Sequence, residues 1–195
     1  FARGRTGSFL RSGVELLAGI PSVVYGFFGL VIIVPFVRLL GPGTGLSVLA
    51  ASLILGIMIL PTVITVAQSA LDAVPARYYE GALALGVDHE HAVFKVVAPA
   101  AASGIMAAIV LGLGRAIGET MAVVMVAGNM PIIPDSLLSG VRTMTANIVL
   151  EMGYAADLHR EALIATGVVL FVFILLITML LNVIRKRRSE ERRVG

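Results

Sequence analysis

The chain has 195 residues, of which 58% are hydrophobic and 14% are charged, and its formal net charge is +3. A soluble domain carries about a quarter charged residues, and several apolar runs here reach the roughly 20 residues that a helix needs to cross a bilayer. These figures argue against a soluble helical domain and predict an all-α, polytopic membrane protein. The chain has no cysteine, which excludes disulfides, thiolate metal sites and cysteine nucleophiles.

Four apolar segments predict four membrane-spanning helices packed as a transmembrane bundle. They run approximately over residues 14–40, 46–71, 97–127 and 162–184. Pro21, Pro35 and Pro61 lie within the first two segments, where neighbouring helices can satisfy the carbonyls that a proline frees. Glycine and alanine are abundant throughout, which suits close packing of helices in lipid. We therefore treat residues 1–195 as one transmembrane unit.

Lysine and arginine predict the orientation, because cytoplasmic loops carry an excess of both. An even number of spans places the two ends on one side of the membrane, together with the loop 72–96. That side holds eleven basic residues, whereas the side with loops 41–45 and 128–161 holds three. We therefore expect cytoplasmic termini and interpret the basic tail 185–195 as an orientation signal rather than a nucleic-acid-binding patch.

The external segment 128–161 is too long to be a plain turn. Val141, Met144, Ile148 and Met152 recur in it at helical spacing. This pattern predicts a short helix lying on the outer surface.

The cytoplasmic loop 72–99 reads DAVPARYYEGALALGVDHEHAVFKVVAP. Pro75 suits the first position of a helix, and Gly86 is a natural stop at its end. Asp88 is placed to cap a second short helix. The sequence therefore predicts a helix, an elbow and a helix, with small residues that let another protein approach closely.

This loop resembles the coupling segment of ABC-transporter permeases of the binding-protein-dependent import class. Their cytoplasmic pattern is E-A-A-x3-G-x9-I-x-L-P. At the same offsets this chain has Glu80, Gly81, Ala82, Gly86, Val96, Ala98 and Pro99. The departures are Gly81, Val96 and Ala98, all small or apolar. The resemblance implies that Glu80, Gly81, Ala82, Gly86 and Pro99 belong to a coupling helix that docks on a separate ATPase subunit.

The sequence shows no P-loop for ATP hydrolysis and no arrangement of residues that suggests other catalysis. A P-loop needs a glycine before its lysine, and neither Lys95 nor Lys186 follows one. His89 and His91 are two residues apart and do not share a helix face, which disfavours a metal site. No nucleophile–base set is recognisable. We therefore expect a transport subunit rather than an enzyme, with no metal and no cofactor.

Two charged residues, Arg115 and Glu119, lie inside the third apolar segment, in the stretch GLGRAIGETMAVV. One interpretation is an i,i+4 pair that stabilises one helix face. The other is a pathway for an oxyanion, because ionisable groups at membrane depth usually face a bundle interior or a wet path. Arginine presents a planar fork of donors to such an anion, Glu119 could accept from a protonated phosphate, and Thr120 adds a small polar group.

The stretch RAIGETMAVVMVAGN also resembles the permeases of phosphate-specific importers. The upstream LAGIPSVVYGFFGL and the downstream RTMTANIVLEMG are closer to their PstC-type subunit than to their PstA-type subunit, and together these stretches cover nearly the whole chain. The resemblance implies a permease core of the MetI-like fold. That core has six spans, so four spans suggest that an N-terminal piece is missing here.

The resemblance also implies a location and partners. We expect a multi-pass protein of a bacterial or archaeal plasma membrane, with a second, PstA-like permease, a PstB-like ATPase dimer and a PstS-like external phosphate-binding protein. A permease for sulfate or molybdate is the alternative within the class. An ATPase-independent secondary transporter or channel is the alternative outside it, and a membrane enzyme is disfavoured by the lack of a catalytic set.

Overall fold

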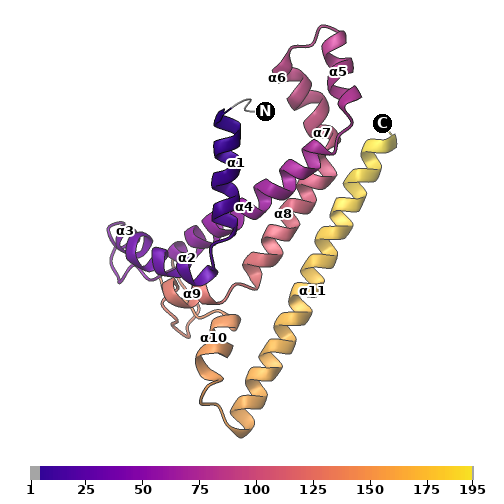
Figure 1. The fold of residues 1–195 in the computed structure, drawn as a ribbon. Helices are drawn as coiled ribbons and strands as arrows, with labels where there is room; N and C mark the ends of the chain where they lie inside the picture. The colour runs from indigo at the N-terminus through magenta and orange to yellow at the C-terminus, as the bar shows by residue number, and fades with distance from the viewer. Residues whose placement is uncertain (1–4, 195) are drawn as a thin grey trace.

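The computed structural model describes residues 5–194, with side chains for residues 7–183, and the described part is helical (Figure 1). In chain order the elements are α1 (Arg5–Ala18), α2 (Ser22–Phe28), the π-helical turn η1 (Gly29–Ile33), α3 (Val34–Arg38), α4 (Val48–Asp72), α5 (Ala76–Ala84), α6 (His89–His91), the π-helical turn η2 (Ala92–Val97), α7 (Ala98–Ala100), α8 (Ala102–Ile117), α9 (Met121–Val126), α10 (Met144–Glu151) and α11 (Asp157–Val194). The side chains of the basic tail 185–195 lie outside the described residues.

Two helices confirm predicted spans directly. α4 and the segment Asp157–Val183 of α11 are each long and apolar enough to cross a membrane. Two further spans are possible if each of two bent helix pairs is counted as one crossing. In Figure 1 the start of α1, the end of α11 and the α5–α6 hairpin lie toward one end of the molecule, and α10 lies toward the other.

The first predicted span is not one helix. The segments Gly7–Ala18 and Ser22–Arg38 meet at an angle of 99°, so the span predicted over 14–40 is a sharply bent pair of helices rather than a helix with proline kinks. Pro21 explains the corner, because it donates no hydrogen bond and disfavours helical geometry at the residue before it. The Tyr25 hydroxyl donates to the carbonyl of Leu17 at 2.8 Å and ties the two arms together.

The third predicted span is also interrupted. Residues 97–127 divide into α7, α8 and α9, with a 67° bend before α8. α8 ends at Ile117, and Gly118, Glu119 and Thr120 are not helical. The prediction of one helix through this stretch is therefore wrong. Glycine is a poor helix former, and the local side-chain bonds of Glu119 compete with continuation of the helix.

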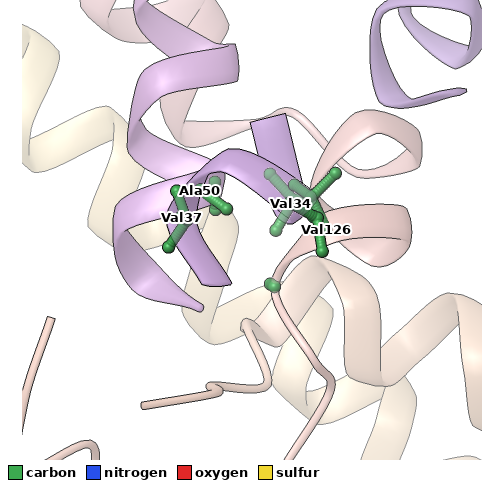
Figure 2. Close-up of a cluster of buried hydrophobic side chains, with 7 residues drawn as sticks. Val34, Val37, Ala50 and Val126 are labelled. Carbon is green, nitrogen blue, oxygen red and sulfur yellow. The ribbon is translucent and has the colours of Figure 1, made fainter. Parts of the chain in front are cut away.

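A core of small and branched side chains lies where α3, the start of α4 and α9 meet (Figure 2). Val37, Ala50 and Val126 are almost fully buried there. The backbone amides that open α4 are bonded by the segment that follows α9. Val48 N–H donates to the carbonyl of Ser139 at 3.0 Å, and Leu49 N–H donates to that of Leu137 at 2.8 Å. These bonds satisfy donors that the start of a helix leaves free.

Close contact between α4 and α8 depends on small residues. Ala108 of α8 is fully buried. A Cβ added at Gly112 would lie 2.6 Å from Val63 Cγ2, and one added at Gly104 would lie 2.4 Å from Ala70 Cβ. Glycine or alanine at every fourth residue of α8 therefore lets the two helices approach closely.

The segment 128–161 contains the predicted short helix, which is α10. It begins after Thr143, whose hydroxyl accepts from Ala146 N–H at 3.2 Å as an N-cap. It packs against α11 and α9, and so connects the break after α8 to the last long helix.

Candidate functional site

Arg115 lies in the last turn of α8 and reaches α4. Its Nη1 donates to the hydroxyl of Thr62 at 3.0 Å. Thr62 comes 14 residues after the start of α4 and ten residues before its end. At about 1.5 Å per residue, the contact lies well inside an apolar helix that matches the ~30 Å bilayer core. Because Arg115 is exposed on the surface of the chain, its charge remains available to other groups.

Glu119 and Thr120 lie in the break between α8 and α9. Glu119 Oε1 accepts from the backbone N–H of Ala122 at 3.2 Å, in the first turn of α9. The backbone carbonyl of Glu119 accepts from the Thr145 hydroxyl at 3.2 Å, which attaches α10 to the break. The Thr120 hydroxyl donates to the carbonyl of Gly118 at 3.3 Å. All three hydrogen bonds therefore stabilise the conformation of the break between α8 and α9.

The i,i+4 interpretation of Arg115 and Glu119 does not hold. Among the described side chains, the ion pairs join other residues, and Arg115 is not paired with Glu119. The reason is local, because α8 ends between the two residues. Each side chain instead has a partner of its own, Thr62 for Arg115 and the start of α9 for Glu119.

Thr62 was missed in the sequence. It follows Pro61, which lies inside α4. A polar residue beside a proline in an apolar span is a weak signal, because serine and threonine commonly satisfy the backbone near such prolines. The pairing with Arg115 joins residues 53 positions apart, and therefore depends on how α4 and α8 pack.

The loop 72–96 folds as the predicted helix, elbow and helix. α5 begins at Ala76, one residue later than predicted, because Pro75 holds the capping position. Gly86 N–H donates to the carbonyl of Leu83 at 3.0 Å, and Val87 N–H donates to that of Ala82 at 3.2 Å. These two bonds form a Schellman motif. Gly86 has a φ of +82°, a conformation that side chains disfavour.

The residues of the coupling pattern are spread along this hairpin. Glu80 and Gly81 are exposed on α5, Gly86 forms the exposed elbow, and Pro99 lies in α7 at the base. Ala82 is buried. The hairpin also carries two prominent apolar side chains, Leu85 beside the elbow at 85% and Phe94 in η2 at 72% exposure. The hairpin therefore offers a small, partly apolar surface.

The second arm of the hairpin begins where Asp88 was expected to cap it. Asp88 does precede α6, but its side chain caps no backbone amide. Its Oδ1 lies 2.7 Å from His91 Nδ1 instead. His89 Nδ1 lies 2.7 Å from the Tyr79 hydroxyl, which joins the two arms. Residues 7–183 include no group of three or more histidine or acidic side chains that could hold a metal ion.

A second polar cluster, which the sequence did not predict, lies in the segment 128–161. Arg142 donates to the carbonyl of Asn129 at 3.0 Å, to Asn147 Oδ1 at 3.3 Å and to Glu151 Oε1 at 2.8 Å. Glu151 Oε2 lies 3.6 Å from His159 Nε2. The cluster joins the residues after α9 to α10 and the start of α11, so it holds the segment 128–161 together.

Comparison with known proteins identifies the chain's relatives. The family described as "Binding-protein-dependent transport system inner membrane component" matches residues 1–190. A probable ABC transporter permease protein, YqgH of Bacillus subtilis, is 41% identical over 92% of this chain and 59% of its own length. A protein named phosphate transport system permease protein PstC, from Mesorhizobium japonicum, is 38% identical over 84% of this chain and 57% of its own. Its namesake from Xylella fastidiosa is 34% identical over 92% and 62%.

The extent of these matches is uneven. They cover most of this chain, but the chain spans only about three fifths of the length of the curated relatives. No solved structure is significantly similar to it.

Proposed function

Because this chain belongs to the family of binding-protein-dependent transport system inner membrane components, we propose that it forms the translocation path of an ATP-driven importer of inorganic phosphate. The observation that carries the proposal is Arg115, a cation that reaches from α8 to the middle of α4 and remains exposed. The relatives named phosphate transport system permease protein PstC support phosphate as the cargo.

Arg115, Glu119 and Thr120 are proposed to line the phosphate path. A guanidinium offers several N–H donors in one plane, which suits the oxygens of a tetrahedral anion. One Nη1 hydrogen bond to Thr62 leaves other donors of this group unused. A carboxylate such as Glu119 can accept the hydrogen of a protonated phosphate, and sulfate at neutral pH carries no such hydrogen. This difference favours phosphate over sulfate or molybdate.

The hairpin of α5, α6 and η2 is proposed to be the surface that docks on the ATPase. Its exposed elbow at Gly86 permits close approach, and Leu85 and Phe94 present apolar area that a partner would cover. The chain itself has no P-loop lysine. ATP hydrolysis therefore belongs to a separate subunit in this proposal.

The remaining partners and the orientation follow from the same proposal. A second permease would complete the path beside the exposed face of Arg115, and an external phosphate-binding protein would deliver the anion to the α10 side. The hairpin, both chain ends and the basic tail would face the cytoplasm. The common position of the hairpin, the start of α1 and the end of α11 toward one end of the molecule supports this orientation (Figure 1).

Uptake and co-purification test the proposal together. The full-length protein is expressed with its neighbouring transporter genes in cells that lack their own phosphate importers, and uptake of labelled phosphate is measured with excess sulfate or molybdate. We expect saturable uptake that neither competitor suppresses, and co-purification of a P-loop ATPase. Suppression by sulfate would favour the other oxyanion. Uptake with no associated ATPase would favour a secondary transporter.

A further inference from the structure

We infer that Thr62 is a positioning residue for Arg115, and that its hydroxyl sets how the guanidinium presents its free donors to the transported oxyanion. The inference rests on the proposed function and adds a residue on α4 to a site otherwise located at the end of α8 and in the break after it. The observation behind it is the 3.0 Å bond from Arg115 Nη1 to Thr62 Oγ1.

Most other hydroxyls in the long helices behave differently. Thr65 and Ser69 of α4 and Thr166 and Thr178 of α11 each donate to the carbonyl four residues earlier in their own helix. This is the ordinary way for a hydroxyl to be satisfied within a span. Within the described residues Thr62 makes no such bond, and its oxygen accepts from a different helix instead.

The local packing gives this hydroxyl a fixed position. Thr62 follows Pro61, which is buried in α4. One turn of α8 before Arg115, Gly112 packs closely on Val63, the next residue of α4. The backbones of the two helices are therefore held close together beside the bond. In a helix a β-branched threonine has only two favoured χ1 rotamers, so its oxygen has few alternative positions.

The effect on Arg115 follows from the shape of the guanidinium. The group is a planar fork, and one bond at Nη1 restricts rotation of that plane. The donors on Nη2 and Nε then have a defined direction before the anion arrives, and less rotational freedom is lost when it binds. In addition, the Thr62 O–H has no acceptor among the described residues, so it can donate to an oxygen of the same anion.

The experiment compares hydroxyl-deleting and hydroxyl-retaining variants in the assembled, full-length transporter. Thr62→Val keeps the shape of the side chain and removes the acceptor, whereas Thr62→Ser keeps the acceptor. Thr65→Val is the matched control, because it deletes a hydroxyl one turn away that bonds only its own helix. We measure the maximal rate of labelled phosphate uptake and, in parallel, the ATP hydrolysis stimulated by the external binding protein.

We expect Thr62→Val to lower maximal uptake roughly tenfold, the scale of one lost hydrogen bond to a charged group. Stimulated ATP hydrolysis should stay close to that of the unsubstituted transporter. Thr62→Ser and Thr65→Val should both transport near normally. If Thr62→Val assembles poorly, the smaller Thr62→Ala makes the same test. Normal uptake in an assembled Thr62→Val or Thr62→Ala protein, or equal losses in Thr62→Val and Thr65→Val, would overturn the inference.

A second comparison shows whether Thr62 acts through Arg115. An ammonium group has no planar fork to orient, so Thr62→Val should cost much less in an Arg115→Lys background. The same fractional loss in both backgrounds would reject a positioning role. Should the unsubstituted transporter carry sulfate and not phosphate, the phosphate assignment fails, and the ranking of the same variants on sulfate uptake still decides the role of Thr62.

Discussion

Glu151 shows how a single carboxylate stabilises the segment 128–161. The hydrogen bond from the Tyr154 hydroxyl is the main cause of a pKa for Glu151 below its usual value of 4.5, and the hydrogen bond and charge of Arg142 act in the same direction. The same bond raises the pKa of Tyr154. Because the pKa of Glu151 is lower in the folded state, its ionised form stabilises that state.

The sign of this shift gives a prediction for acid stability. The stabilisation from Glu151 is complete above pH 4.5, its unshifted pKa, and is lost as the pH falls through the folded pKa. The thermal midpoint of the detergent-purified protein should therefore fall less steeply in acid for Glu151→Gln than for the unsubstituted chain. Glu161→Gln, which changes an exposed carboxylate outside the cluster, is the control. An unchanged acid profile in Glu151→Gln would contradict the prediction.

Arg115 gives a second prediction at the scale of the residue. Arg115→Gln keeps some donors but removes the charge, so most phosphate uptake should be lost while the complex still assembles. Arg115→Lys keeps the charge without the fork and should retain part of the uptake. Uptake and the amount of assembled transporter are measured together, so that poor assembly is not mistaken for loss of transport.

Exchanging the two charges provides a sharper control. In the double variant Arg115→Glu with Glu119→Arg, residue 115 can no longer donate its N–H groups to an anion, and residue 119 can no longer accept from Ala122 N–H. The exchange should therefore fail to restore uptake. Full uptake by a well-expressed exchange variant would show that the two charges act only as an interchangeable pair.

Among the elements, the contact between α4 and α8 makes the clearest prediction. Gly112→Ala adds a methyl group 2.6 Å from Val63 Cγ2, whereas Gly114→Ala on the same helix adds one where no atom lies within 4 Å. The Val63 side chain is β-branched and restricted at χ1, so it cannot easily rotate away from the added methyl group. Gly112→Ala should therefore destabilise the protein by about 1–3 kcal/mol, and Gly114→Ala should not. The thermal midpoints of the purified variants give the answer, and equal midpoints would show that the helices can separate without cost.

The hairpin of α5, α6 and η2 allows a similar matched pair. Gly86→Val places a branched side chain at a φ of +82°, which costs roughly 1–2 kcal/mol or more and should distort the elbow. Gly81→Ala lies in regular α5 with open space around it, and alanine favours helix there. Gly86→Val should lose ATPase co-purification and uptake while remaining in the membrane, and Gly81→Ala should keep both. Normal coupling in Gly86→Val would remove this hairpin as the docking surface.

For the whole molecule, the orientation in the membrane is the property to test. Residues 1–195 contain no cysteine, so a single cysteine introduced there is labelled without background from this part of the protein. Ser136→Cys lies in the segment 128–161 and is exposed, and Ser189→Cys lies in the basic tail. An impermeant thiol reagent applied to intact cells should label position 136 and leave position 189 unlabelled until the cells are opened. Labelling of position 189 alone would reverse the proposed orientation.

The sequence by itself determined the membrane class and the elements that depend on local rules. The length of their apolar runs is enough to predict α4 and α11, because a helix of about 20 apolar residues is long enough to cross the bilayer core. Gly86 alone is enough to place the elbow, since a left-handed residue ends a helix there. The spacing of Val141, Met144, Ile148 and Met152 likewise predicted α10. Arg115 could be singled out as a candidate site residue, because a charge in an apolar membrane segment is costly and usually faces a bundle interior or a wet path.

The tertiary structure alone decided where helices break and which side chains meet. The corner at Pro21 and the break at Gly118 lie within apolar runs that hydropathy reads as continuous, because hydropathy averages over windows longer than these breaks. The partner of Arg115 was expected at Glu119, four residues away, and is Thr62 on another helix. That choice follows from the close packing of α4 and α8 through Gly112 and Gly104, because only packing brings residues 53 positions apart within hydrogen-bonding distance.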